Sequence, residues 1–226
     1  MNASKNKLIQ CKDELRETIL SQNSYFFIPF FIWIIMGGIS LLLFSRDELF
    51  FAINHSHTPL LDKLNTILSA YGRGDIIPIL LTTLLFIPAF RTRHYIFTTI
   101  SFGIVIPIAI HFFKSFFNTP RPLKYYANTN IHTVPWLENA FETSFPSGHT
   151  MGAFGLFFLL SVYLPNSNKP WSLLFFFLAL GCGFSRLYLG QHFFVDIYVG
   201  SIMGTLLTLI IYVTSITFIK SQKHHA

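Results

Sequence analysis

The chain has 226 residues, of which 52% are hydrophobic and 12% are charged, with 27 phenylalanines and a formal net charge of +6. An average soluble domain carries about 25% charged residues, and a soluble domain of this length could not bury so much apolar surface. The composition therefore excludes an ordinary soluble protein. No basic stripe with interleaved aromatic residues accompanies the positive charge. We therefore predict no nucleic-acid partner, and attribute the charge to membrane topology and anionic lipid headgroups.

Long apolar runs predict an all-α polytopic membrane protein built as a six-helix transmembrane bundle. Residues 25–44, for example, contain no charge over about the ~20 residues that cross a bilayer. We expect a single membrane-embedded domain, residues 1–226. Its spans are predicted at about 25–44, 76–90, 95–117, 148–164, 171–188 and 191–218.

Two polar stretches are predicted outside these spans. Residues 60–71 place leucine and isoleucine at helical spacing on one face, which is typical of an amphipathic helix along the membrane interface. The N-terminal segment, residues 1–24, carries charge pairs that suit either an interfacial or a solvated cytoplasmic helix. The first apolar run is too long for a cleaved signal peptide. Cys11 lies in a polar segment and Cys182 lies in an apolar run, so we expect the two at different depths and no disulfide between them.

The distribution of Lys and Arg predicts the orientation. With a cytoplasmic N-terminus, nine of the 16 basic residues lie inside and seven outside, and three of those seven belong to polar clusters. The remaining balance of nine against four favours cytoplasmic N- and C-termini under the positive-inside rule. In a bacterial inner membrane, the ends of spans that carry the polar clusters then face the periplasm.

Three polar clusters interrupt the apolar sequence on that outer side. Ionisable residues in spans are costly and usually face partners or a water-filled cavity. Arginine presents a planar fork to phosphate oxygens, and lysine a point charge. The clusters are Lys114 with Arg121-Pro122, then Pro146-Ser147-Gly148-His149, then Ser185-Arg186 with His192 and Asp196.

Two of these clusters contain histidine, which indicates acid–base or nucleophilic chemistry. Ser147 suits the N-cap of a helix whose free N–H groups favour an anion, and His149 in its first turn could donate a proton. His192 and Asp196 are four residues apart, which places them on one helical face, so the carboxylate can orient the imidazole.

The other histidines form no set. His111, one turn before Lys114, could join the site, but it is interpreted first as packing or as support for the site. Two histidines and an aspartate could bind zinc, but three neighbouring cations would repel a divalent ion. We therefore predict no metal and no cofactor.

Taken in order, the three clusters resemble the three-part signature of the type 2 phosphatidic acid phosphatase (PAP2) superfamily. Its members include membrane lipid phosphatases, soluble acid phosphatases and vanadium haloperoxidases. The resemblance covers residues 114–196, and the six-span layout extends it over nearly the whole chain. Members often carry a further arginine after the Arg-Pro pair, whereas here Leu123 stands in that place, and the following Lys124 could substitute for that arginine.

The resemblance implies a mechanism and a site. His192 would attack phosphorus and form a phosphohistidine, Asp196 would orient it, and His149 would protonate the leaving oxygen. Water would then hydrolyse the intermediate without a metal. The phosphoryl oxygens would be held by Lys114, Arg121, Ser147, Gly148 and Arg186.

We predict that the protein is a lipid phosphatase that works at the outer leaflet. Its substrate is a lipid phosphate, and membrane lipids surround the protein. Candidate substrates are undecaprenyl (polyprenyl) diphosphate, phosphatidylglycerol phosphate, phosphatidate and a lipid A phosphate. We favour the polyprenyl carrier or a glycerolipid phosphate. The connection at about 118–145 is predicted to select the headgroup, with Tyr125, Tyr126, Trp136, Glu138 and Glu142.

Three alternatives remain open at this point: an anion transporter or channel, a vanadium haloperoxidase, and a phosphotransferase that passes the phosphoryl group to another lipid. Against a transporter, the sequence shows no paired broken helices in corresponding halves. The sequence makes no prediction of oligomeric state.

Overall fold

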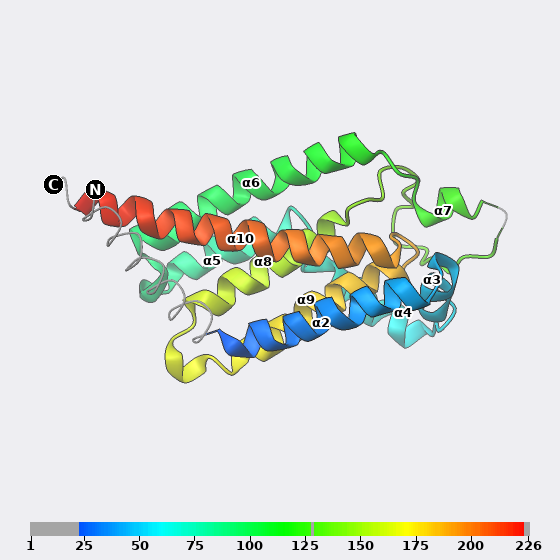
Figure 1. The fold of residues 1–226 in the computed structure, drawn as a ribbon, viewed down its shortest axis with the longest axis horizontal. Helices are drawn as coiled ribbons and strands as arrows, with labels where there is room; N and C mark the ends of the chain where they lie inside the picture. The colour runs from blue at the N-terminus through cyan, green and yellow to red at the C-terminus, as the bar shows by residue number, and fades with distance from the viewer. Residues whose placement is uncertain (1–22, 128, 224–226) are drawn as a thin grey trace.

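The computed structural model describes residues 23–127 and 129–223, and in these ranges every regular element is a helix (Figure 1). Predictions that fall on residues 1–22, including those for Cys11, lie outside the described residues. Cys182 is buried as a free thiol. The elements are α2 (Ser24–Leu43), α3 (Arg46–Asn54), α4 (Pro59–Ala70), α5 (Ile76–Thr83), η2 (Leu84–Phe86), η3 (Pro88–Phe90), α6 (Arg93–Phe117), α7 (Pro122–Tyr125), α8 (Gly148–Tyr163), η4 (Asn166–Asn168), α9 (Trp171–Tyr188) and α10 (Phe194–Lys223).

Four helical segments in the described part of the chain are long and apolar enough to cross a membrane: Ser24–Leu43, Arg93–Tyr125, Trp171–Tyr188 and Phe194–Ile219. The other two predicted spans are shorter apolar helices, Ile76–Phe86 and Gly148–Tyr163. With 16 residues, α8 is about 24 Å long, which is less than the ~30 Å hydrocarbon core. The chain is thus an all-helical integral membrane protein, and helix length does not confirm the six-span count.

The short helix α8 lies at the centre of the bundle, between α9 and α10 on one side and α5 and α6 on the other (Figure 1). Its side chains from Thr150 to Leu159 are buried. A Cβ added at Gly204 of α10 would lie 2.2 Å from the Met151 carbonyl oxygen, so the two backbones pack directly together. Because protein surrounds α8, this helix does not need a lipid-facing surface of full membrane length.

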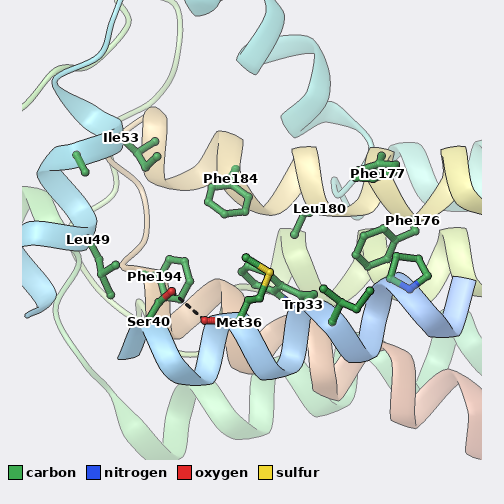
Figure 2. Close-up of a pocket in the computed structure, with 14 residues that line it drawn as sticks. Trp33, Met36, Ser40, Leu49, Ile53, Phe176, Phe177, Leu180, Phe184 and Phe194 are labelled. Carbon is green, nitrogen blue, oxygen red and sulfur yellow. Dashed lines mark hydrogen bonds between the residues drawn. The ribbon is translucent and has the colours of Figure 1, made fainter. Parts of the chain in front are cut away.

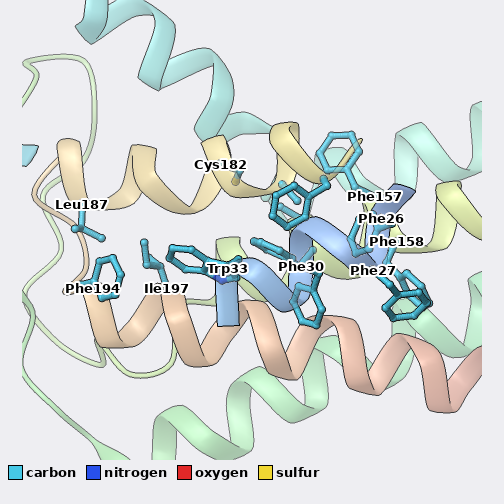
Figure 3. Close-up of a cluster of buried hydrophobic side chains, with 14 of the residues drawn as sticks. Phe26, Phe27, Phe30, Trp33, Phe157, Phe158, Cys182, Leu187, Phe194 and Ile197 are labelled. Carbon is cyan, nitrogen blue, oxygen red and sulfur yellow. The ribbon is translucent and has the colours of Figure 1, made fainter. Parts of the chain in front are cut away.

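Aromatic side chains fill the core between α2, α8 and α9 (Figure 3). The ring of Phe26 lies 5.4 Å from that of Phe158 and 5.8 Å from that of Phe176, measured between centroids. Such ring pairs contribute about 0.5–1.5 kcal/mol beyond the burial of their area. In the same core, Trp33 Nε1 donates a hydrogen bond of 2.8 Å to Ser201 Oγ of α10. These contacts fix α9 and α10 together, and therefore the turn that joins them.

An apolar cavity of about 550 Å³ lies between α2, α3, α9 and α10 (Figure 2). Trp33, Met36 and Phe184 are among its lining residues, and Ser40 Oγ donates to the Met36 carbonyl oxygen of its own helix at 2.9 Å. None of the described residues that line this cavity is titratable. Its walls therefore offer no acid, base or cation for chemistry.

Short helices gather at one end of the bundle, where α3, α4 and α7 lie near the turn between α9 and α10 (Figure 1). The amphipathic helix predicted around 60–71 is confirmed as α4, whose Leu60 and Ile67 are exposed. Its location along the membrane interface stays a prediction. The sequence analysis missed α3, although Ser45 and Glu48 form a capping box, which is a helix-start signal.

Candidate active site

The three predicted clusters come together at this end of the bundle. A cavity of about 440 Å³ between α5, α6 and α8 is lined by five of the eight predicted site residues: Lys114, Arg121, Gly148, His149 and His192. The other three, Ser147, Arg186 and Asp196, are buried but do not belong to the lining.

His192 lies in the turn between α9 and α10, so the prediction that it stands on the same helix as Asp196 is wrong. The helix begins two residues later, because the Asp196 carboxylate accepts the Phe193 amide N–H at 2.9 Å and caps the first turn. The predicted contact nevertheless exists, since His192 Nδ1 lies 3.4 Å from Asp196 Oδ2. Both side chains are almost fully buried, at 1% and 2% exposed.

Ser144 joins this pair and was not predicted. It is fully buried, its Oγ donates to Asp196 Oδ2, and it lies 3.4 Å from His192 Nδ1. A serine two residues before a proline motif has no distinctive spacing, so the sequence contained no signal for this role. The result is an aspartate held by two donors and facing one nitrogen of the imidazole.

Burial, followed by the positive charges of Arg121, Arg186 and Lys114, holds the pKa of His192 well below its usual value of 6.5. A neutral imidazole that faces a carboxylate through Nδ1 carries its hydrogen there, an assignment made from the contacts. The lone pair then lies on Nε2, which has no hydrogen-bond partner among the described residues. His192 thus combines a ring nitrogen without a described partner with a place in the cavity lining.

Lys114 lies in the last turn of α6, and Arg121 is the N-cap of α7, so these two cations flank a helix break that contains Pro120. Lys114 Nζ donates to the Thr143 carbonyl oxygen at 2.7 Å. Arg121 donates from Nε to the Glu142 carbonyl oxygen at 2.9 Å and from Nη1 to Gln191 Oε1 at 3.0 Å. Backbone carbonyls therefore position both cations and leave their charges unneutralised.

Arg186 is 6% exposed and is not among the residues that line the cavity. Its Nη1 donates to Ser69 Oγ of α4, a partner that the sequence analysis did not identify. Its Nε is a buried donor without a hydrogen-bond partner in the described part of the chain. A buried guanidinium with an unused donor is suited to an anion.

The second cluster forms the start of α8. Ser147 is the predicted N-cap, and its Oγ accepts from the Thr150 amide at 3.4 Å and from Thr150 Oγ1 at 2.9 Å. His149 follows in the first turn and lines the cavity. A Cβ added at Gly72, between α4 and α5, would lie 2.2 Å from the His149 carbonyl oxygen. The turn before α5 therefore packs directly on the backbone of this histidine.

Apart from His111, the rest of the cavity wall carries no titratable side chain and follows α5 and α6, with Ile77, Phe102, Gly103, Ile106 and Ile110. Phe102 precedes Lys114 by twelve residues, or about 18 Å along the helix. Gly103 is exposed, and a Cβ there would meet no atom within 4 Å. One cavity thus connects the charged end of the site to the apolar interior of the bundle.

Two further residues near the site were considered from the sequence. His111 lines the cavity, which agrees with the alternative that it joins the site rather than with packing alone. Lys124, which follows the position of the missing arginine, pairs with Glu142 on the surface and is not among the lining residues.

In the ranges that the structure describes, no group of three or more His, Cys, Asp or Glu side chains could hold a metal ion. Three histidines and two cations line the cavity, and the buried Arg186 is a third cation of the site; this set suits an anion.

Comparison with known proteins agrees with this geometry. Residues 91–220 match the sequence pattern of the PAP2 superfamily. The undecaprenyl-diphosphatase BcrC of Bacillus subtilis (strain 168) is 30% identical over 166 residues, 73% of this chain and 78% of the relative. A protein of Bacillus licheniformis named bacitracin transport permease protein BcrC is 30% identical over 79 residues, 35% of this chain and 37% of its own.

Two crystal structures share the fold. LpxE of Aquifex aeolicus superimposes with a TM-score of 0.63 at 30% identity, covering 76% of this chain and 97% of its own. A transmembrane PAP2 type phosphatidylglycerolphosphate phosphatase of Bacillus subtilis superimposes with a TM-score of 0.61 at 20% identity, covering 83% and 94%. The prediction of a phosphatase-class hydrolase is confirmed, and this integral membrane protein belongs to the PAP2 superfamily.

Proposed function

We propose that this protein is a lipid phosphatase that cleaves a phosphate monoester or diphosphate through a phosphohistidine on His192. The observation that carries the proposal is the continuous cavity, with two histidines and two cations at one end and apolar walls along α5 and α6. A phosphate group fits the charged end, and the hydrocarbon chain of the same molecule fits the apolar part.

In the first step, Nε2 of His192 attacks phosphorus with its lone pair, and the bond from phosphorus to the leaving oxygen breaks. The imidazole becomes positively charged, and Asp196, held by Ser144 and the Phe193 amide, stabilises that charge. His149 donates a proton to the leaving oxygen. In the second step, His149 takes a proton from water as the water oxygen attacks phosphorus, the P–N bond breaks, and inorganic phosphate and neutral His192 are released.

Lys114, Arg121 and Arg186 stabilise the charge that develops on the phosphoryl oxygens, together with the start of α8 at Ser147 and Gly148. Three cations disfavour a fourth positive charge on His149. A bound phosphate group brings negative charge among them and offsets that repulsion, so substrate binding itself favours the protonated acid.

Among the candidate lipids, undecaprenyl diphosphate has the best support, because the undecaprenyl-diphosphatase of Bacillus subtilis matches 73% of the chain. Phosphatidylglycerol phosphate, phosphatidate and a lipid A phosphate remain candidate substrates. We place the protein as one six-span domain, residues 1–226, in a bacterial inner membrane, with cytoplasmic termini and a periplasmic site. The nine-to-four balance of basic residues supports this orientation.

The test is phosphate release by the detergent-purified protein from each of the four lipids, with EDTA present throughout. We expect release with EDTA, fastest from the diphosphate. Transfer of label to a second lipid in place of water would favour a phosphotransferase. The absence of both release and transfer, from a folded protein, would contradict the proposal and favour transport.

A further inference from the structure

We propose that Asn54 is a positioning residue for His192, and that it acts through a clamp made with Asp62, His132 and Tyr188. Asn54 ends α3 and is fully buried. A buried amide is costly unless it is hydrogen-bonded, so its partners show what it holds in place. This inference rests on the proposed function for its catalytic consequence but not for its structural part.

The side chain of Asn54 bonds two segments at once. Its Nδ2 donates to the His132 carbonyl oxygen at 3.0 Å, and its Oδ1 accepts the His132 amide N–H at 2.9 Å. The same Nδ2 donates to the Tyr188 carbonyl oxygen at 2.9 Å. That carbonyl belongs to the last residue of α9, where the helix leaves carbonyls without internal partners.

Asp62 of α4 holds the same two residues through their side chains. Its Oδ1 lies 2.7 Å from His132 Nε2 and accepts a hydrogen bond of 2.6 Å from the Tyr188 hydroxyl. The ring of His57 stacks on His132 with centroids 3.9 Å apart. Two anchors on two helices thus fix one loop residue and one end of α9. No set was predicted among these histidines, whereas in the structure His57 and His132 stack on each other.

The clamp contacts the turn that carries the proposed nucleophile. Gly190, two residues before His192, has a φ of +67°, and a Cβ there would lie 3.1 Å from the His132 carbonyl oxygen. The turn is closed by the amides of Gln191 and His192, which donate to the Arg186 carbonyl oxygen at 2.9 and 3.2 Å. Fixing Tyr188 and His132 therefore fixes both sides of the turn.

The loop on the other side of the clamp also forms part of the site. About ten residues after His132, the carbonyls of Glu142 and Thr143 hold Arg121 and Lys114. Release of the clamp would therefore free both the turn that carries His192 and the loop whose carbonyls hold Arg121 and Lys114. Misplacement of reacting groups by about 1 Å can cost on the order of a hundredfold in rate.

The test compares wild type with Asn54→Leu and Asn54→Asp, with Asn65→Leu as the matched control. Asn65 lies on the neighbouring helix α4 and donates only to the Leu61 carbonyl oxygen of its own helix at 2.9 Å. Asp62→Asn is the second variant, which loses the carboxylate and keeps the shape. The readouts are kcat and KM for the best lipid, and hydrogen exchange of residues 129–145 and 189–193.

For both Asn54 variants we expect kcat to fall about tenfold to a hundredfold with KM changed less than about threefold. Exchange should accelerate at least tenfold in both segments together, while α8 and α10 keep wild-type exchange. Asp62→Asn should give a smaller change of the same kind, and Asn65→Leu none.

Unchanged exchange in residues 189–193, or equal acceleration in every helix, would overturn the clamp. Faster exchange with unchanged kcat would overturn the positioning role. If the wild-type protein releases no phosphate, the proposed function fails, and the exchange data still decide whether the clamp exists.

Discussion

Two histidines in this bundle each belong to a hydrogen-bonded network, yet their surroundings differ in kind. His94, at the start of α6, is half-buried, and both its ring nitrogens contact hydroxyls: Nδ1 is 2.9 Å from Tyr163 Oη and Nε2 is 2.8 Å from Ser215 Oγ. His192 contacts a carboxylate through Nδ1, and its Nε2 has no described protein partner. His192 lines a cavity with two cations, and His94 does not.

The difference shows what turns a histidine into a candidate nucleophile. A ring with both nitrogens engaged by neutral hydroxyls connects helices, in this case α6, α8 and α10. A ring with one nitrogen oriented by a carboxylate, and the other facing a cavity, has a lone pair available for a substrate. The following changes test this contrast.

Replacing the orienting carboxylate should have the largest effect among these changes. We expect Asp196→Asn to lower kcat about a thousandfold to ten-thousandfold, because the amide can favour the wrong tautomer and cannot stabilise an imidazolium. The control is Ser215→Ala in the His94 network, which should keep activity within about threefold. Similar kcat values for the two variants would contradict the contrast.

Filling the apolar part of the cavity should have a smaller and substrate-dependent effect. Gly103→Phe places a ring in open space on the cavity side of α6, since a Cβ added at this position would meet no atom within 4 Å. We expect kcat/KM for a long-chain lipid phosphate to fall about tenfold, with little change for para-nitrophenyl phosphate.

The matched control is Ile104→Phe, one residue further along the same helix, where the side chain is 55% exposed and lies outside the cavity lining. Equal losses for Gly103→Phe and Ile104→Phe would remove the evidence that the lipid chain occupies this cavity.

The pH dependence should show that His192 stays neutral. Burial and the neighbouring cations lower its pKa below 6.5, so the protonated form appears only when the pH falls through that lower value. The unfolded chain takes up this proton near pH 6.5, so His192 also reduces folding stability below that pH. We expect the acid limb of kcat/KM that reports His192 to lie well below pH 6.5.

A limb that belongs to the enzyme must be the same for a monoester and a diphosphate substrate. Arg121→Gln removes one of the cations and should move the limb upward. A limb at or above pH 6.5 in wild type, or no movement in the variant, would contradict the assignment.

Replacing the other histidine should have the smallest effect on activity. His94→Phe removes two hydrogen bonds inside the bundle, each contributing about 0.6 to 2 kcal/mol in membrane proteins. We expect a lower Tm in detergent, with kcat/KM at 25 °C within about threefold of wild type. A loss of activity as large as that of Asp196→Asn would mean that the two networks are coupled.

The sequence predicted which residues form the site, but it did not predict the residues that hold them in position. Membrane-length apolar runs and three ordered clusters were sufficient to bring Lys114, Arg121, His149 and His192 to one cavity. The partners that position them were not predictable in the same way. Ser69, Ser144 and Asn54 are ordinary polar residues in sequence, and only the tertiary contacts give them partners.

The fold shows the same division. Apolar length predicts the long helices, but it does not decide whether the short helix α8 crosses the membrane, because buried and lipid-facing helices have equally apolar sequences. The start of α10 was misplaced because the Asp196 carboxylate caps the helix, which shortens it by the turn that carries His192. The capping box at Ser45 and Glu48 is a sequence signal for the start of α3, but this helix was not predicted.

The central claim is that His192 is the nucleophile, and trapping of the intermediate tests it most directly. Wild type, His192→Ala and His94→Ala would be mixed with a lipid labelled with ³²P on its terminal phosphate, in EDTA, and quenched within one turnover. The account predicts label on the wild-type and His94→Ala chains, and none on His192→Ala, whose turnover falls by at least about 10⁴-fold. Label on His192→Ala, or phosphate release by wild type without any labelled chain, would contradict it.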